Sequence, residues 1–307
     1  MSEEVYIIGH MNPDTDSICS AIAYAEFKKQ TGLGDNYLAA RIGELNSETA
    51  YVLERFGFSE PVLLENGAGK KIILVDHNEE SQSIDGYAEA DIVEVIDHHK
   101  INFRCSEPIL YHSEPLGSTA TIIAEMFLSS LEEVDKGVAG LLLSAILSDT
   151  VVFRSVTTTD RDIEVADKLA GFAGIDDVKA FGIEVKKAKS SLEGICARDI
   201  IFSDFKDFEF NGSRVGVGQI EVVDNREAVD RGGELIDELE KIKLDEGYDL
   251  LVLMVTNIMD EGSELMVVGL TDRVEAAFNS KVEDNRVYLK GVMSRKKQVV
   301  PQLEGVF

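Results

Sequence analysis

Basic residues, cysteines and long apolar runs are all scarce in this sequence. Its 307 residues include 30 Lys and Arg against 57 Asp and Glu, which gives a formal net charge of −27 at pH 7. A charge of this sign repels nucleic-acid backbones at long range and favours solubility and cation binding. An anionic substrate must therefore be met by a local basic cluster or by a metal ion.

The few cysteines and short apolar runs exclude several classes of protein. Cys19, Cys105 and Cys196 are odd in number and form no CxxC pair, so neither a disulfide framework nor a thiolate metal site is indicated. The longest apolar stretch, VAGLLLSAIL at 138–147, is well short of the roughly 20 residues of a membrane span. The segment MSEEVYIIGH has two glutamates where a secretory signal carries positive charge. We therefore expect a soluble, cytoplasmic protein with no membrane partner.

Up to about residue 190, short β-branched runs alternate with segments of helical periodicity. The pattern predicts strands at 5–10, 71–77 and 92–99, and helices at 17–30, 117–131 and 138–149. This alternation predicts an α/β domain with a parallel sheet and helices on both faces.

A polar stretch, KKAKSSLEG at 186–194, separates this series from a second one. The second series predicts a long charged helix at 227–247, a shorter one at 273–281 and a hairpin connection at 257–264. Its predicted strands are 214–223, 249–257, 264–270 and 286–292. We therefore predict an N-terminal domain at 1–187, a linker at 188–194 and a smaller C-terminal α/β domain at 195–307.

Four of the five histidines lie at predicted strand ends, beside or near aspartate. They occur in GHMNPDTDS, VDHNE and IDHHK, and are His10, His77, His98 and His99. An open parallel sheet binds ligands at the carboxyl ends of its strands. Three separate strands are therefore expected to bring His and Asp to one edge of the sheet.

Two interpretations of GHMNPDTDS stay open from that segment alone. Pro13 stiffens the turn, Asp16 or Ser17 is well placed to cap the next helix, and Asp14 and Asp16 fit ordinary turn and cap positions equally well. The acids and histidines at 76–77 and 97–99 favour a metal site, because clustered carboxylates repel one another unless a cation neutralises them. Asp149 ends an apolar helical run, and its own segment favours a solvent-facing helix terminus over a ligand.

The candidate donors are imidazoles and carboxylates without thiolates. This set suits manganese, cobalt or magnesium better than structural zinc. Two ions about 3.5–4 Å apart can share a carboxylate, lower the pKa of a water between them and hold a phosphoryl group for in-line attack. The site is therefore expected to be a phosphohydrolase centre.

The densest basic cluster lies near the C-terminus, in GVMSRKKQVVPQ. Arg295, Lys296 and Lys297 suit phosphate oxygens, because arginine binds them bidentately and lysine adds a point charge. A solvated charge run is the alternative for this segment. Lys206, in FSDFKDFEF, is a weaker single candidate.

Five segments together resemble a known family over essentially the whole chain. GHMNPDTDS, VDHNE, VIDHHK, SDT at 148–150 and SRKKQ are similar to the family II, manganese-dependent inorganic pyrophosphatases of the DHH phosphoesterase superfamily. Exopolyphosphatases and RecJ-like nucleases also carry the DHH motif. SRKKQ is typical of the pyrophosphatase C-terminal domain, of DHHA2 type, and the GGGH motif of the nuclease relatives is absent.

The resemblance implies a role for each matching residue. It implies that His10, Asp14 and Asp76 hold one metal ion, and that Asp16, Asp76, His98 and Asp149 hold a second, so that Asp76 bridges. It also implies that Asp97 and His77 orient ligands. The residues implied to act on the substrate, as catalytic and pyrophosphate-binding groups, are His99, Lys206, Arg295 and Lys296.

The resemblance also implies two Mn²⁺ per subunit, with Co²⁺ or Mg²⁺ as possible substitutes, Mg²⁺ entering with the substrate, and a homodimer. We therefore predict hydrolysis of inorganic pyrophosphate to two phosphates by metal-activated water, in a cleft between the domains. The linker would let the second domain close over the substrate.

Two rival functions are kept. One is an exopolyphosphatase or a small-oligonucleotide phosphodiesterase, although the acidic charge and the lack of an aromatic-interleaved basic surface disfavour nucleic acid. The other is a non-catalytic metal- or nucleotide-sensing module on the same fold. Candidate ligands at every position of the motif disfavour this second rival.

Overall fold

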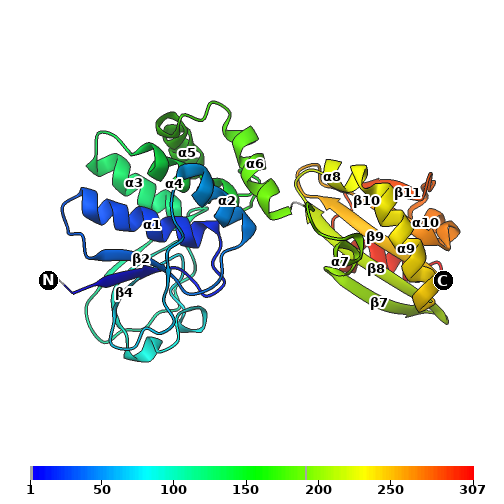
Figure 1. Cartoon of the computed structure of the whole chain (residues 1–307), viewed down its shortest axis with the longest axis horizontal. Helices are drawn as coiled ribbons and strands as arrows, with labels where there is room; N and C mark the ends of the chain where they lie inside the picture. The colour runs from blue at the N-terminus through cyan, green and yellow to red at the C-terminus, as the bar shows by residue number, and fades with distance from the viewer. Residues whose placement is uncertain (1–2, 191) are drawn as a thin grey trace. The chain divides into compact units, whose positions relative to one another are not determined.

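The computed structural model describes residues 3–190 and 192–307 of the chain. The chain divides into two compact units, Met1–Lys189 and Ser190–Phe307, each with its own sheet (Figure 1). We call them unit 1 and unit 2 and describe each by itself.

The sheet of unit 1 has six parallel strands in the order β3-β2-β1-β4-β5-β6. The strands are β1 (Val5–Ile8), β2 (Tyr37–Arg41), β3 (Val62–Leu63), β4 (Lys71–Val75), β5 (Asp91–Asp97) and β6 (Leu110–Ser113). The chain runs outward from β1 to β3 and then returns to the other side of β1 to begin β4. Such a reversal opens a crevice at the carboxyl ends of the two central strands, where ligands bind in open α/β sheets.

The two faces of this sheet are covered differently. Helix α1 contacts β1, β2 and β4, α3 contacts β5, and α4 packs on both helices (Figure 1). Residues of the opposite face, such as Ile8, Leu74 and Val95, pack against Ile84 and Tyr87 from a segment with two short 3-10 helices, η1 (Glu80–Gln82) and η2 (Tyr87–Glu89). The α-helices of unit 1 are α1 (Thr15–Gln30), α2 (Ser47–Phe56), α3 (Thr119–Ser130), α4 (Lys136–Asp149), α5 (Asp160–Ala173) and α6 (Val178–Ser190).

The sheet of unit 2 is mixed, with the order β11-β10-β9-β8-β7. Only the β8 and β9 pair is parallel among its described pairings. The strands are β7 (Phe205–Phe210), β8 (Ser213–Val222), β9 (Leu250–Asn257), β10 (Gly262–Gly269) and β11 (Arg286–Lys290). Because successive side chains point to opposite faces, β9 gives Leu251 and Leu253 to one core and Val252 and Met254 to the other.

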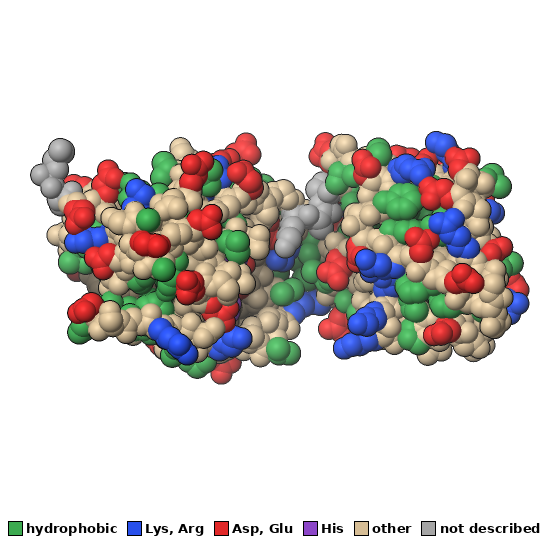
Figure 2. Space-filling model, turned by 90° about the horizontal axis from the view of Figure 1, so that it is seen from below, with side chains coloured by type: hydrophobic (Ala, Val, Ile, Leu, Met, Phe, Trp, Pro, Cys, Tyr) green, Lys and Arg blue, Asp and Glu red, His purple; other side chains and the backbone are tan. Residues whose placement is uncertain are grey.

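Helices cover both faces of this second sheet. The first core includes residues of α7 (Ala197–Phe202), α8 (Arg226–Asp230) and α9 (Gly232–Glu246). The second includes residues of α10 (Thr271–Phe278), the π-helical turn η3 (Arg295–Val299) and α11 (Val300–Glu304). Acidic, basic and apolar side chains are mixed over the face of each unit that Figure 2 presents.

The predicted fold class is confirmed, since a parallel sheet with helices is followed by a second α/β unit. The hairpin predicted at 257–264 joins β9 to β10. The single helix predicted at 227–247 is wrong, because α8 ends at Asp230 and α9 begins at Gly232. Gly232 and Gly233 weaken helix continuity, and Arg231 between the helices donates to the carbonyls of Leu192 and Ile195.

Several elements of the structure were not predicted from the sequence. Edge strand β7, for example, alternates poorly because Asp207 and Glu209 interrupt its phenylalanines. The others are β2, β3, β6, α2, α5, α6, α7 and α11.

The predicted linker at 188–194 begins inside a helix. Helix α6 continues through Ser190, and the next residue lies outside the described part of the chain. The domain boundaries at 187 and 195 stay predictions. Among the described residues, no helix combines the length and the apolar character that crossing a membrane requires.

Candidate metal centre

The centre lies where β1 and β4 end, at the crevice of the unit 1 sheet. His10 follows β1 by two residues, and Asp76 follows β4 directly. Nε2 of His10 lies 3.6 Å from Oδ2 of Asp76. The close approach of the next helix requires glycine at position 9, because a Cβ there would lie 1.7 Å from Oγ of Ser17. That same Oγ accepts a hydrogen bond from the His10 amide at 3.1 Å.

Asp76 leaves the strand in a left-handed conformation. Its φ is +60°, which is uncommon for a residue other than glycine, and its amide donates to the carbonyl of Ile96 at 3.0 Å. Strained backbone of this kind concentrates at functional sites. The Asp76 side chain is buried, and Oδ1 accepts from the Thr119 hydroxyl at 3.1 Å.

The first turn of α1 supplies two more acids. Asp14 caps the helix, and its Oδ1 accepts from the Ser17 amide at 3.0 Å while lying 3.6 Å from Nε2 of His10. The prediction of Asp16 or Ser17 as the cap is therefore wrong. Asp16 instead points into the unit, where its carboxylate accepts from the amides of Thr119 and Ala120 at 2.7 and 2.9 Å.

His98 and Asp149 approach from β5 and from the end of α4. Nδ1 of His98 lies 2.9 Å from the Leu116 carbonyl, which only accepts, so Nδ1 carries a proton and Nε2 faces the carboxylates. Nε2 lies 3.4 Å from Oδ1 of Asp76 and 3.3 Å from Oδ2 of Asp149. Asp149 is thus both the last residue of α4 and a member of this cluster.

The donor atoms form overlapping groups that share Asp76. In each group, one donor atom from every residue lies within 4.8 Å of the others. The groups are His10, Asp14 and Asp76; Asp16, Asp76, His98 and Asp149; and Asp76, His98 and His99.

Burial and mutual repulsion disturb the titration of these acids. Burial and the charges of Asp16 and Asp14 raise the pKa of Asp76 well above its usual range. The same causes raise the pKa of Asp149 to about 8, and burial raises that of Asp16. Burial lowers the pKa of His98, but the charges of Asp16 and Asp149 outweigh it and the pKa is raised. Carboxyl groups this crowded ionise readily only beside a cation.

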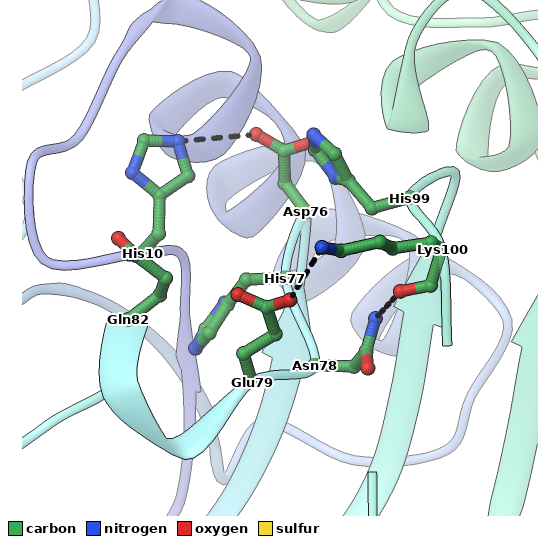
Figure 3. A pocket seen from close by; sticks show the side chains of 8 residues that line it. All are labelled: His10, Asp76, His77, Asn78, Glu79, Gln82, His99 and Lys100. Atoms are coloured by element: carbon green, nitrogen blue, oxygen red, sulfur yellow. Dashed lines mark hydrogen bonds and ion pairs between the residues drawn. The ribbon is translucent and has the colours of Figure 1, made fainter. Parts of the chain in front are cut away.

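His99 is one of the residues that line a cavity of about 280 Å³ (Figure 3). Its backbone N–H donates to Oδ1 of Asp97 at 3.1 Å, and its Nδ1 lies 2.9 Å from the same oxygen. Burial opposes ionisation of Asp97, but hydrogen bonds from His99 and Asn78 outweigh it and lower its pKa. An ionised Asp97 only accepts, so Nδ1 of His99 carries the proton. The His99 side chain is 52% exposed, which leaves its ring accessible from the cavity.

His77 faces away from the metal donors. Its Nδ1 lies 3.0 Å from the Val75 carbonyl and its Nε2 lies 3.1 Å from Oγ of Ser83. Burial lowers its pKa to about 4, so the ring stays neutral. His77 therefore holds the loop after β4, whereas Asp97 contacts His99 directly.

The basic candidates gather within unit 2. Nη1 of Arg295 donates to the carbonyl of Asp204 at 2.5 Å and of Val217 at 3.3 Å, and Nη2 donates to Oδ1 of Asp204 at 2.8 Å. Lys206 pairs with Val217 in the β7–β8 ladder, so it lies next to this contact. The ammonium groups of Lys206 and Lys296 are exposed and have no ion-pair partner among the described residues.

The flanking residues of SRKKQ fix its backbone. Oγ of Ser294 accepts from the Lys297 amide at 3.2 Å. Oε1 of Gln298 accepts from the amides of Met293 and Ser294 at 2.9 and 3.0 Å, and its Nε2 donates to the Gly291 carbonyl at 2.8 Å. These bonds fix the turn that presents Lys296.

Comparison with known proteins places both units in families. Residues 4–146 match the DHH family, N-terminal domain, and residues 183–306 match the DHHA2 domain. A manganese-dependent inorganic pyrophosphatase from Methanocaldococcus jannaschii is 51% identical over 98% of this chain and 99% of its own length. One from Bacillus subtilis is 42% identical over 98% of both chains. The chain belongs to the manganese-dependent inorganic pyrophosphatases.

One solved structure agrees with this family, and a second shares only the fold. A crystal structure from Methanococcus jannaschii, named as a family II inorganic pyrophosphatase, is 50% identical, with a TM-score of 0.62 over 98% of this chain and 99% of its own. An exopolyphosphatase-related protein from Bacteroides fragilis has a TM-score of 0.50 over 99% of this chain and 92% of its own, at 16% identity. This second likeness shows the fold alone.

The donors fit the manganese that gives these pyrophosphatases their name. Within the described residues, Nε2 of His98 is buried without a hydrogen-bond partner, although Asp76 and Asp149 surround it. A buried polar atom of this kind needs a partner, and a divalent cation bound by imidazole and carboxylates supplies one. The Leu116 carbonyl orients His98 as residues behind metal ligands commonly do.

Sequence reasoning missed several residues that hold the site. Asn78 is buried and binds Asp97, the Lys100 carbonyl and the Asn102 amide. Thr119 begins α3 and binds both Asp16 and Asp76. Thr119 directly follows Ser118, the N-cap of α3, and no local signal in GSTAT indicated that its amide and hydroxyl would bind aspartates distant in sequence.

Proposed function

We propose that this chain hydrolyses inorganic pyrophosphate to two phosphates at a centre of two manganese ions in unit 1. The observation that carries the proposal is the sharing of Asp76 between two donor groups, in a chain whose relatives are named manganese-dependent inorganic pyrophosphatases. We assign one ion to His10, Asp14 and Asp76, and the other to Asp16, Asp76, His98 and Asp149. Cobalt or magnesium can replace manganese with these donors, and a further Mg²⁺ accompanies the substrate.

Bound manganese would polarise phosphoryl oxygens and lower the pKa of a water molecule near the phosphorus. The chain itself supplies the orientation of the ligands. The Leu116 carbonyl presents Nε2 of His98, and the amides of Thr119 and Ala120 fix the Asp16 carboxylate. Asp97 presents the ring of His99, whose Nε2 is proposed to contact a phosphate oxygen.

The cations for the substrate are assigned to Lys206, Arg295 and Lys296. Lys296 and Lys206 have exposed ammonium groups available to phosphate. Arg295 has five N–H donors, of which three serve the contacts to Asp204 and Val217. Two N–H groups are left for phosphate oxygens, so Arg295 is the more constrained of the three.

Phosphate release tests this function directly. Purified protein is given pyrophosphate, tripolyphosphate or a short oligonucleotide, with manganese, with magnesium or with chelator. We expect manganese-dependent release from pyrophosphate, with little from the other two substrates. Preference for tripolyphosphate would support the exopolyphosphatase alternative, and absence of any turnover would leave a metal-binding module.

A homodimer and a cytoplasmic location remain predictions. The first comes from the family resemblance and the second from the sequence. Light scattering of the manganese-loaded protein measures the oligomeric state, and fractionation of the source cells measures the location.

A further inference from the structure

Glu48 is a buried acid that the proposed chemistry does not use. It lies in the first turn of α2 and is 2% exposed. Its Oε1 accepts from the Thr15 hydroxyl at 2.7 Å and also from the Ser148 hydroxyl. Burying a carboxylate costs free energy unless hydrogen bonds and an opposite charge stabilise it, so we expect the Glu48 side chain to have a specific role.

Both hydroxyls belong to residues adjacent to proposed metal ligands. Thr15 stands between Asp14 and Asp16 at the start of α1, and Ser148 directly precedes Asp149 at the end of α4. Oε1 of Glu48 therefore connects two segments. One carries Asp14 and Asp16, which are assigned to different ions, and the other carries Asp149, which is assigned to the second ion. The two segments are more than 130 residues apart in sequence. Thr15 is 33 residues from Glu48, and Ser148 is 100 residues from it.

Lys186 of α6 supplies the opposite charge. Its Nζ lies 3.2 Å from Oε2 of Glu48 and donates to both the carbonyl and the hydroxyl of Ser148 at 3.3 Å. The Lys186 side chain is 14% exposed, so the pair is shielded from solvent. Lys186 thus contacts the backbone of the residue before Asp149 as well as the acid.

We propose that Glu48 and Lys186 are positioning residues that hold the start of α1 and the end of α4 at the separation the metal ions require. The pair acts through Thr15 and Ser148. The inference rests on the proposed metal centre. It extends that centre to a buried ion pair behind the ligands, where substitutions typically cost about 10–100-fold in metal affinity.

A second ion pair joins the same two helices and provides the matched control. Arg55 of α2 lies 3.2 Å from Oε1 of Glu184 on α6, and these side chains are 37% and 48% exposed. Neither residue contacts Thr15 or Ser148 in the described structure. Loss of this pair removes a link between α2 and α6 but leaves both metal-bearing segments fixed.

The test measures Mn²⁺ affinity of the whole chain without substrate, by titration at a temperature where circular dichroism shows each variant folded. Glu48→Ala is expected to weaken binding by about 10–100-fold. Glu184→Gln is expected to bind as tightly as the unaltered chain. Equal affinity of Glu48→Ala and the unaltered chain would overturn the proposal, as would equal losses in both variants.

A paired substitution separates hydrogen bonding from charge. Glu48→Gln together with Lys186→Met removes both buried charges but keeps Oε1 as an acceptor for the two hydroxyls. We expect this double variant to recover most of the affinity lost in Glu48→Ala. Affinity as low as that of Glu48→Ala would contradict positioning through Thr15 and Ser148.

If Glu48→Ala does not fold, Ser148→Ala and Thr15→Val decide the matter, since each removes one hydroxyl. Each is then expected to weaken Mn²⁺ binding several-fold, and unchanged affinity in both would overturn the proposal. Metal binding is measured apart from turnover. A chain that binds Mn²⁺ without hydrolysing pyrophosphate would disprove the proposed function and still test this inference, whereas a chain that binds no Mn²⁺ would overturn both.

Discussion

The two units of this protein differ in where their functional charged side chains lie, crowded together in unit 1 and exposed to solvent in unit 2. Unit 1 crowds the carboxyl groups of Asp16, Asp76 and Asp149 together with His98 behind amide and hydroxyl donors, at a clear cost to their ionisation. Unit 2 leaves the ammonium groups of Lys206 and Lys296 exposed to solvent, where an unpaired charge is inexpensive. It follows from this difference that the crowded carboxyl groups of unit 1 require a bound cation. The two exposed lysines of unit 2 can instead bind an anion without first breaking an ion pair.

The largest expected effect comes from the residue shared by the donor groups. Asp76→Asn removes one carboxylate from both proposed ions. Metal catalysis contributes several kcal/mol of transition-state stabilisation, and each 1.4 kcal/mol corresponds to tenfold, so pyrophosphate turnover should fall about 10³-fold or more. Metal analysis after dialysis should show less manganese per chain.

Asp85, one of the exposed acids of unit 1, supplies the control for that variant. Asp85→Asn should keep both turnover and manganese content. Full manganese content in Asp76→Asn would mean that the donor groups do not share this carboxylate.

The second expected effect separates the units. Lys296→Ala should lower kcat/KM for pyrophosphate by about 10–100-fold, because a hydrogen bond to a charged group contributes about 1.5–3 kcal/mol. Mn²⁺ affinity without substrate should not change, since the metal donors all lie in unit 1. Steady-state kinetics and a metal titration on the same preparation measure both quantities.

Lys290 is an exposed lysine of unit 2 at the end of β11, and Lys290→Ala is the matched control. Its kinetics should equal those of the unaltered chain. If Lys296→Ala also had unaltered kinetics, Lys296 would have no part in substrate binding.

The third prediction concerns the pH dependence of stability in metal-free protein. The pKa of Asp149 is about 8 in the folded chain and near its ordinary value when unfolded. A raised carboxyl pKa favours the folded state at low pH, and this contribution is lost as pH rises towards 8. The Tm of metal-free wild type should therefore fall relative to Asp149→Asn between about pH 5 and pH 8.

Saturating Mn²⁺ should reverse the order of these two proteins at pH 8, because an ion that binds the folded state stabilises it. Thermal denaturation with chelator and with Mn²⁺ measures both effects. Parallel pH curves for the two metal-free proteins would show that Asp149 is not under electrostatic strain.

The smallest expected effect lies in the turn that presents Lys296. Gln298→Ala removes three hydrogen bonds to the backbone of 291–294 and should cost about 1–2 kcal/mol of stability in unit 2. KM for pyrophosphate should rise a few-fold, with Mn²⁺ affinity unchanged. A change in Mn²⁺ affinity instead would contradict the assignment of metal binding to unit 1 alone.

Part of this site could be predicted from the sequence because its residues lie at strand ends. The motifs around His10, Asp76 and His98 each follow an apolar run, and parallel strands place such positions at one edge of a sheet. Asp149 could not be assigned from its segment, since an acid at the end of a helix has the same local pattern whether or not it meets His98. Strand β7 was not predicted, because Asp207 and Glu209 interrupt its apolar pattern.

By itself, the sequence determined which kinds of side chain the two units carry, because composition and periodicity are local properties. Only the tertiary structure decided which of them meet. Asp14 became the cap of α1, and Asp76, with its left-handed φ, became a member of all three donor groups. Glu48 came to lie between Thr15 and Ser148. These contacts join segments far apart in the chain, and their geometry follows from the packing of helices on the sheet, which no single segment encodes.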